Sequence, residues 1–467
     1  MNDARIACLD QGSGSTKGAA FDAEGRVLAQ TRVPIGTVHD GDRVEHDPEE
    51  IWTSVEKTLA ELAAAAGPLS AIGLCVQRSS CLLWQRNDAR PLSPVVSWQD
   101  RRHAAAIAAT PRALADEVRR RTGLFLSPHY AAPKLRGLLD VIAGARAAAA
   151  RGEVIAGTLD AWLVHRLTGA PSTEAGIAGR TLLYDLEEDA WSSALCDAFE
   201  IPRAALPPLR PAAGRRGEWR GVPVLALAGD QQAALVGHGG WRRGVVAAHF
   251  GTGAFVLAAT GDAVLRHAGL LSAVLAATAR ERRFQIEGTV QSAGSAIDWI
   301  CALCGVTLDA LPGRPLAPER LPVVVPAFVG LGAPWWRPEA RARIDDVELA
   351  TSAEDLVAAT LVGVAQRVAD NLEAMRQAGL RVETLRVSGR LTRCPQFLAV
   401  VAELGGCTVE LAAEEESGLE GIARLARALG DDAPLAAAAA WRERRAPEWS
   451  EARRAEARGR WLRALGV

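Results

Sequence analysis

The stretch VPVLALAGDQQAALVG, residues 222–237, decides the fold class of this chain. Its apolar run ends at Gly229, an acid follows at Asp230, and an Ala/Leu-rich helical pattern begins at once. This order predicts a buried strand that delivers a carboxylate to the start of a helix. Active sites of open α/β sheets lie at the carboxyl ends of the strands, and this position makes Asp230 a candidate catalytic residue. The alternative, that Asp230 is only a helix N-cap, stays open on this stretch alone.

A second strand that ends on an acid lies near the N-terminus. The apolar strand IACLD ends at Asp10, a turn rich in glycine and hydroxyl groups follows, and GAAFD returns as a second strand. Backbone N–H groups in such a turn can bind phosphate oxygens, and a lysine adds positive charge. The candidate phosphate contacts are Ser13, Gly14, Ser15, Thr16 and Lys17. No GKS or GKT opens a helix here, so the turn is not a Walker A loop. A β-hairpin that only needs glycine is the alternative.

The same plan recurs in the second half of the chain. GVVAAHFGTGAFVLAATG, residues 244–261, again predicts a strand, a glycine turn with a hydroxyl at Thr252, and a returning strand. Two such hairpins predict two related halves. We expect each half to offer a phosphate-binding turn to a shared cleft.

Polar and aromatic residues follow two further apolar runs. AIGLCV closes on Gln77, Arg78 and Ser79, and VVS closes on Trp98 and Gln99. Hydrogen-bonding groups beside an aromatic face are what a small hydroxylated ligand needs. Solvated loops are the alternative for each stretch by itself.

Length and composition are those of an ordinary globular protein of two domains. The 467 residues exceed what one core usually supports, and 49% hydrophobic with 23% charged residues is a normal balance. A net charge of -2 gives no electrostatic footprint for nucleic acid or an anionic membrane. The first dozen residues lack the parts of a signal peptide, and no apolar run is long enough to predict a membrane span. We therefore expect a cytoplasmic protein with no nucleic-acid or membrane partner.

The 8 cysteines are scattered along the chain, as in reduced cytosolic proteins. Cys301 and Cys304 have CxxC spacing, but no second pair completes a zinc site. Near the C-terminus, residues 353–375 carry apolar side chains at three/four spacing, which predicts a core helix. The Arg-rich residues after Trp441 are expected to form a surface helix.

Taken in order, these strings resemble the FGGY family of carbohydrate kinases, and the first half is most similar to the glycerol kinase branch. The strings are LDQGSGSTKGAAFD, VEHDPEEIW, the QR of VQRSS, SWQDRR, TLDAWLVHRLTG, GDQQAALVG, FGTGAF, PAFVGLGAPWW and ESGLEGIA. They are spread over nearly the whole chain in the family's order. The resemblance implies an α/β fold of two ribonuclease H-like, actin-like ATPase domains with a cleft between them. It places residues 1–239 on the sugar side and residues 240–467 on the nucleotide side.

The resemblance also implies roles for individual residues. Asp230 would be the general base that takes a proton from the substrate hydroxyl, and Asp10 would hold Mg²⁺. ATP would lie with its phosphates between the two glycine turns. The implied nucleotide and phosphate contacts are Ser13, Gly14, Ser15, Lys17, Gly251, Thr252, Gly294, Asp298, Gly389, Arg390 and Cys394. Phosphoryl transfer needs alignment and charge stabilisation above all, so an acid, a metal and two N–H cradles form a sufficient set.

The substrate side departs from the glycerol kinase branch. The implied substrate contacts are Arg78, Ser79, Trp98, His129, Asp230 and Gln231. Ser79 stands where that branch has a Glu, and His129 stands where it has a Tyr. A lost carboxylate removes charge-assisted hydrogen bonds of about 1.5–3 kcal/mol each. These departures favour a larger polyol or a ketose over glycerol as the small-molecule substrate.

The nucleotide side departs as well. The family's DGGA-type turn is Ser388-Gly389-Arg390-Leu391 here, and Cys394 replaces the usual Asn. Arg390 could stack on the adenine or block its pocket. Because Asp10, Asp230 and both glycine turns are present together, the leading hypothesis is an ATP-dependent carbohydrate kinase. The alternatives are a degenerate kinase that senses a sugar or nucleotide, and an ATPase of the same superfamily. A homo-oligomer is compatible with the sequence.

Overall fold

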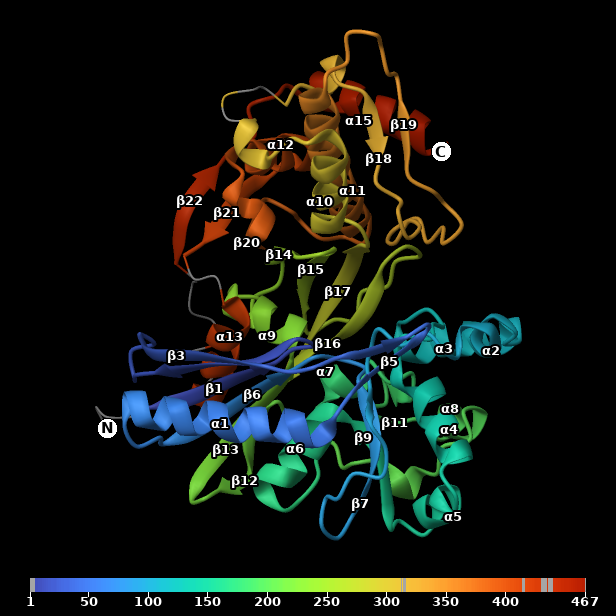
Figure 1. The fold of residues 1–467 in the computed structure, drawn as a ribbon, viewed down its shortest axis with the longest axis vertical. Helices are drawn as coiled ribbons and strands as arrows, with labels where there is room; N and C mark the ends of the chain where they lie inside the picture. The colour runs from blue at the N-terminus through green and yellow to red at the C-terminus, as the bar shows by residue number, and fades with distance from the viewer. Residues whose placement is uncertain are drawn as a thin grey trace.

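Two β-sheets, one in each lobe of the molecule, organise the chain (Figure 1). The computed structural model describes residues 5–466 apart from 312, 314–315, 414–415, 430–434 and 436–439. The fold is α/β, as predicted, with helices on the faces of the two sheets.

The first sheet has the strand order β12-β13-β6-β1-β2-β3. Its strands are β1 (Ile6–Gln11), β2 (Ser15–Phe21), β3 (Val27–Pro34), β6 (Ala71–Val76), β12 (Ala213–Trp219) and β13 (Val222–Gly229). Strands β1, β6 and β13 run parallel, so their carboxyl ends meet at one edge. Helix α1 (Pro48–Ala66) packs on β2 and β3, and it starts at Asp47, whose side chain accepts a hydrogen bond from the backbone of Glu49.

The second sheet repeats this plan in the order β16-β17-β15-β14-β20-β21-β22. Its strands are β14 (Val246–Phe250), β15 (Ala254–Gly261), β16 (Leu271–Ala277), β17 (Arg282–Val290), β20 (Thr384–Gly389), β21 (Thr408–Ala412) and β22 (Trp441–Arg445). As in the first sheet, a glycine hairpin joins two antiparallel strands, and two further strands then run parallel to the first of them. The predicted duplication is confirmed by this topology.

Helices of the second lobe include the predicted core helix. They are α10 (Gly294–Cys304), α11 (Ala353–Gln377) and α12 (Pro395–Gly405). Helix α11 begins with a capping box between Ser352 and Asp355. The hairpin of β18 (Val323–Val325) and β19 (Arg343–Asp345) lies beside it.

An insertion in the first lobe carries part of the candidate site. A five-stranded sheet has the order β4-β5-β8-β7-β9, formed by β4 (Val38–Asp40), β5 (Arg43–His46), β7 (Cys81–Gln85), β8 (Val95–Val96) and β9 (Val154–Thr158). Its helices are α2 (Ala104–Ala108), α3 (Arg112–Thr122), α4 (Ala131–Val141), α5 (Ala145–Ala150) and α8 (Ser193–Ala198). Helix α6 (Leu159–Thr168) packs mainly on β12 of the first sheet, and α7 (Ala175–Ala178) packs on β16 of the second sheet and β13 of the first. A short ladder joins β10 (Tyr184–Asp185) and β11 (Ala190–Trp191). The insertion brings the ends of β6 and β8 close to the start of α4.

Helices α9 (Asp230–Gly237) and α13 (Ser417–Arg427) join the two lobes. Helix α13 packs on β1, β6 and β13 of the first sheet although it follows β21 of the second. The two helices approach closely through glycine: a Cβ on Gly421 would lie 1.8 Å from the carbonyl oxygen of Ala233. Apolar side chains of both sheets form one core around this pair, including Cys8, Leu257 and Ile422. The lobes therefore share buried surface at the joint.

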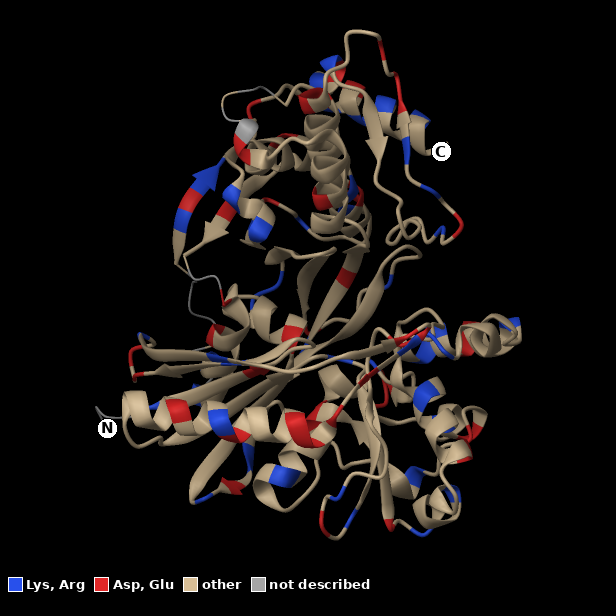
Figure 2. Cartoon of the chain, viewed as in Figure 1, with Lys and Arg blue, Asp and Glu red and all other residues tan. Residues whose placement is uncertain are grey.

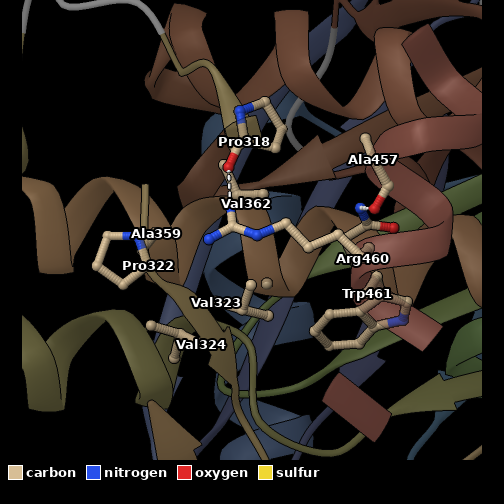
Figure 3. A pocket seen from close by; sticks show the side chains of 11 residues that line it. Pro318, Pro322, Val323, Val324, Ala359, Val362, Ala457, Arg460 and Trp461 are labelled. Atoms are coloured by element: carbon tan, nitrogen blue, oxygen red, sulfur yellow. Dashed lines mark hydrogen bonds between the residues drawn. The ribbon is translucent and has the colours of Figure 1, made fainter. Parts of the chain in front are cut away.

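The Arg-rich C-terminal residues form more than the surface helix that the sequence predicts. Strand β22 pairs with β21, and only then does α15 (Glu451–Leu465) begin. Helix α15 is anchored by Trp461, which is 2% exposed. Figure 3 shows a crevice at this anchor, with Arg460 reaching toward Pro318. Its volume of about 20 Å³ has room for about one water molecule and not for a substrate.

Basic and acidic residues are mixed along the elements of both lobes (Figure 2). Over the described part of the chain, no helix has the length and apolar character of a membrane span. A larger cavity, of about 410 Å³, is lined by Phe125 of the first lobe and by Trp335 and Trp336 of the second.

Candidate active site

Asp10 and Asp230 lie at the same edge of the first sheet. Asp10 is paired with Cys75 on β6, and Cys75 is paired with Ala228 on β13, two residues before Asp230. Gly229 occupies the N-cap position of α9, so the reading of Asp230 as a mere N-cap is wrong. Burial and the neighbouring charge of Asp230 raise the pKa of Asp10 to about 6. Burial also raises the pKa of Asp230.

Arg78 connects Asp230 to a buried ion-pair network. Its Nε lies 3.3 Å from Oδ1 of Asp230, and its Nη1 donates to Oε2 of Glu287 at 3.0 Å. Arg180 donates to the same carboxylate of Glu287, and its side chain is only 4% exposed. The guanidinium of Arg78 also lies 5.9 Å from the ring centroid of Phe255. Two cations therefore face two carboxylates, which fixes the position of Arg78 beside Asp230.

Trp98 and His129 form a polar and aromatic wall next to the first glycine turn. The indole Nε1 of Trp98 donates to Oγ of Ser13 at 3.0 Å, and Ser13 donates to Oε1 of Gln77 at 3.1 Å. Nδ1 of His129 lies 3.1 Å from the carbonyl oxygen of Trp98. Trp98 is 36% exposed, so part of its ring faces outward. The structure thus brings together residues from four segments that the sequence predicts at the site.

Ser79 and Gln231 complete the predicted substrate residues. Ser79 has a left-handed backbone with φ 67°, and its Oγ donates to the carbonyl oxygen of Arg180 at 3.1 Å. Oε1 of Gln231 is buried, and no described group donates a hydrogen bond to it. An unsatisfied buried acceptor of this kind is suited to receive a hydroxyl group.

The first turn is smaller than the sequence predicts. The backbone N–H of Gly12 donates to the carbonyl oxygen of Ser15 at 3.1 Å, and β2 begins at Ser15. The hydroxyl of Ser15 is buried and accepts from Nε of Arg32. Nζ of Lys17 donates to Oε1 of Glu416 in the other half of the chain at 2.7 Å. Lys17 is therefore near the turn, but it is engaged by a carboxylate.

The second turn lies against the start of α10. The backbone N–H of Gly294 donates to the carbonyl oxygen of Gly251 at 3.0 Å, and Ser295 donates in the same way to Thr252. A Cβ on Gly294 would lie 2.4 Å from the oxygen of Gly251, so this contact requires glycine. The side chain of Thr252 is exposed.

The end of β20 lies beside this turn. Gly389 is paired with Phe250, and its φ of 101° together with a 2.4 Å approach to the oxygen of Phe250 requires glycine. Arg390 points across to α10, where its Nη2 donates to Oδ2 of Asp298 at 2.5 Å. Cys394 is 8% exposed, and its Sγ lies 3.6 Å from Oε1 of Gln396. Arg390 thus spans the space between the end of β20 and α10.

The residues 6–237 match the N-terminal domain of the FGGY family of carbohydrate kinases, and residues 246–429 match its C-terminal domain. The chain belongs to the FGGY family of carbohydrate kinases. A glycerol kinase of Methylibium petroleiphilum is 35% identical, with 98% of each chain covered. A glycerol kinase of Trichlorobacter lovleyi is 36% identical, again with 98% of each chain covered.

Solved structures share the fold of this FGGY chain. The glycerol kinase of Plasmodium falciparum with ADP has a TM-score of 0.91 at 23% identity, covering 99% of this chain and 97% of that one. A xylulose kinase of Rhodospirillum rubrum has a TM-score of 0.87 at 20% identity, covering 99% and 98%. The two-domain, actin-like fold inferred from the sequence is therefore confirmed.

The residues around Asp10 fit a magnesium ion carried by a nucleotide. Among the residues that the structure describes, no three His, Cys, Asp or Glu side chains gather into a metal site. Mg²⁺ needs no such cage, since it is usually held by one or two carboxylates together with waters and substrate phosphates. The charges of Asp230 and Glu416 both raise the pKa of Asp10, which marks a region of negative potential that a cation would relieve.

Three charged residues of this site in the FGGY chain are absent from the sequence prediction. Glu287 interrupts the apolar strand FQIEGTV, which is a usable signal because a charge inside a buried strand needs a partner. Arg180 gives no such signal, because it follows a short helix and only the tertiary fold brings it to Glu287. Glu416 lies 399 residues from Lys17, so no local pattern could join them.

Proposed function

We propose that this protein transfers the γ-phosphoryl group of ATP to a hydroxyl group of a small polyol or ketose. The observation that carries the proposal is the placement of Asp10 near the end of β1 and of Asp230 just after β13, on either side of β6 at one edge of the first sheet. Each sheet also contributes one glycine turn. Membership of the FGGY family and the named activities of the relatives support it. We also propose a domain division at residues 239 and 240, and a cytoplasmic location in keeping with the free thiols.

Asp230 acts as the general base in this proposal. Its carboxylate accepts the proton of the attacking hydroxyl, so that the oxygen can form its bond to phosphorus as the bond to the ADP oxygen breaks. Burial raises the pKa of Asp230, which strengthens it as a base, while the charge of Arg78 keeps it ionised. Arg78 and Gln231 orient the substrate hydroxyls next to it.

Asp10 would hold Mg²⁺, which supplies charge neutralisation on the phosphates when bound. Backbone N–H groups of the turns at Gly14 and Thr252 would bind phosphate oxygens from the two sides. Gly294, Asp298, Gly389, Arg390 and Cys394 would line the nucleoside part of the site. Lys17 would exchange Glu416 for a phosphate oxygen.

The acceptor is proposed to be larger than glycerol. Ser79 is smaller than the glutamate of the glycerol kinase branch at this position and carries no charge. Its hydroxyl also already donates to the backbone carbonyl oxygen of Arg180. Trp98 and His129 supply an aromatic face for additional carbons. A four- to six-carbon polyol or ketose fits these features better than glycerol.

The test measures ADP release with Mg-ATP across glycerol, erythritol, pentitols, tetruloses, pentuloses and hexuloses. We expect turnover with one larger acceptor to exceed turnover with glycerol, and Asp230→Asn to lower it by about 10²–10⁴-fold. The variant should keep its thermal stabilisation by ATP, which separates catalysis from folding. Ligand stabilisation without ADP release would instead support a sensor, and ADP release without any acceptor would support an ATPase.

A further inference from the structure

Lys134 is a buried cation that the reaction described above does not use. It lies in the first turns of α4 and is 1% exposed. Its Nζ donates to three backbone carbonyl oxygens: that of His129 at 2.6 Å, that of Ser97 at 2.8 Å and that of Ser79 at 3.4 Å. The three N–H bonds of the ammonium group are thus matched by three acceptors.

These carbonyls belong to three of the segments that carry proposed acceptor-binding side chains. Ser79 follows Arg78, Ser97 precedes Trp98, and His129 is itself one of the wall residues. The segments come from different places, after β6, after β8 and before α4. Ser79 lies 55 residues from Lys134 in the sequence, Ser97 lies 37 residues away and His129 lies 5 residues away. One ammonium group therefore joins segments that no single strand or helix holds together.

The hydrogen bond from Lys134 to Ser79 is made to a residue with an unusual backbone conformation. Its φ of 67° is unfavourable for a residue with a Cβ. The contacts that hold this conformation are the hydrogen bond from Nζ of Lys134 to the Ser79 carbonyl and the one from the Ser79 hydroxyl to Arg180. Without Lys134 the carbonyl of Ser79 loses its hydrogen bond from Nζ. Because Arg78 directly precedes Ser79, a change in the Ser79 backbone would shift Arg78 as well.

The charge of Lys134 has no carboxylate partner within salt-bridge distance among the described residues. The acid whose charge acts on Lys134 is Asp100, and its carboxylate is already engaged by the backbone of Val44 and by Arg102. The titratable and charged groups that face Lys134 from the surrounding elements are Cys81, Asp100, Arg102, His103 and His129. Burial lowers the pKa of Lys134 to about 8. Keeping an ammonium here is unfavourable by itself, so the three carbonyl contacts must be what retains it.

Residue usage also singles out Lys134. The sequence has only three lysines, Lys17, Lys57 and Lys134, and all its other Lys/Arg positions are arginine. Three carbonyl oxygens converging on one atom suit a compact ammonium group with three donors, whereas a planar guanidinium suits paired oxygens. The geometry at Lys134 thus explains a lysine in a chain that otherwise prefers arginine.

We propose that Lys134 is a positioning residue for the acceptor site. By binding the backbone carbonyls of Ser79, Ser97 and His129, it holds the side chains of Arg78, Trp98 and His129 in fixed positions relative to one another. The proposal rests on the proposed function for the location of that site. Lys134 touches neither substrate nor nucleotide in this scheme. Its loss should therefore affect the acceptor and leave the nucleotide side unchanged.

Lys134→Met tests the proposal by separating acceptor and nucleotide kinetics. Displacing a positioning group by about 1 Å can cost about 10²-fold in rate. We expect kcat/KM for the acceptor to fall about 10²-fold, while the KM for ATP changes by less than about twofold. Lys57→Met is the matched control, because Lys57 is exposed on α1 and has only a 3.9 Å pair with Glu61. An equal loss on both substrates, or unchanged acceptor kinetics, would overturn the proposal.

Two further measurements keep the test independent of a folding defect and of turnover. Added methylammonium or ethylammonium should partly restore acceptor kinetics in Lys134→Ala, whereas tetramethylammonium, which has no N–H donor, should not. In spectra of protein labelled with ¹⁵Nζ-lysine, the signal lost in Lys134→Met should have N–H protons that exchange slowly with water, because all three donors are buried and hydrogen-bonded. Exchange as fast as that of exposed Lys57 would contradict these contacts. If the wild-type protein phosphorylates nothing, the proposed function fails, but this spectrum still decides whether Lys134 is held as described.

Discussion

At the scale of single residues, Arg390 is the side chain whose effect on activity is hardest to infer from type alone. It replaces a glycine of the family's turn, and its partner Asp298 lies on α10. Both side chains are 59% exposed, so the pair adds little to stability. The Arg390 side chain runs from Gly389 toward the start of α10, where its Nη2 would lie 3.4 Å from a Cβ placed on Gly294.

We expect Arg390→Gly to lower the KM for ATP by about two- to fivefold. A nucleotide that enters between Gly389 and Gly294 must break the Arg390–Asp298 pair, and an exposed pair contributes about 0.2–1 kcal/mol. Initial rates at varied ATP and saturating acceptor measure this effect. Asp298→Ala is the matched variant, since it removes the pair while keeping the arginine, and it should shift KM in the same direction. A higher KM for ATP in Arg390→Gly would mean that the arginine contacts the nucleotide instead.

At the scale of helices and strands, the accuracy of the sequence analysis follows from the range of the interactions involved. The turn after Asp10 and the strand end at Asp230 are local, because a run of apolar residues and the residue that ends it are neighbours in sequence. The contact of Arg180 with Glu287 and that of Lys134 with Ser79 depend on which strands pair, and a single sequence does not state this. Strand β22 was missed for the same reason, since its charged residues pair with β21 only in the folded sheet.

The crossing of α9 and α13 is an element-scale feature with a clear test. Gly421→Ala would place a Cβ 1.8 Å from the carbonyl oxygen of Ala233, so the helices must move apart. We expect the free energy of unfolding to fall by about 1–3 kcal/mol. Gly459→Ala in α15 is the control, because its Cβ would meet only Arg463 Nη1 at 3.5 Å. That variant should raise stability by about 0.5–1 kcal/mol through helix propensity. Urea unfolding of both variants measures the difference, and equal effects would contradict the close crossing.

At the scale of the whole molecule, the two lobes meet around a buried histidine. His238 ends α9 of the first half, and its ring stacks on Trp441 of β22 with an interplanar angle of 18°. Its ionisable neighbours come from the second half: His249 on β14, Arg386 on β20 and Arg424 on α13. Burial above all, and then these neighbours, lowers the pKa of His238 to about 3. The joint between the lobes is therefore built for a neutral imidazole.

This predicts an acid-sensitive joint. In the unfolded chain a histidine binds its proton near pH 6.5, whereas folded His238 stays neutral down to about pH 3, so the unfolded state binds more protons in between. The stabilising contribution is complete above pH 6.5 and is lost as the pH falls toward 3, by about 1.4 kcal/mol per pH unit at most. The fall from pH 6.5 to 5 should therefore cost the wild type about 2 kcal/mol more than it costs His238→Gln. Urea unfolding across this range measures the difference, with exposed His39→Gln expected to follow the wild type. If His238→Gln loses stability as steeply as the wild type, the imidazole at the joint is already protonated in the folded protein.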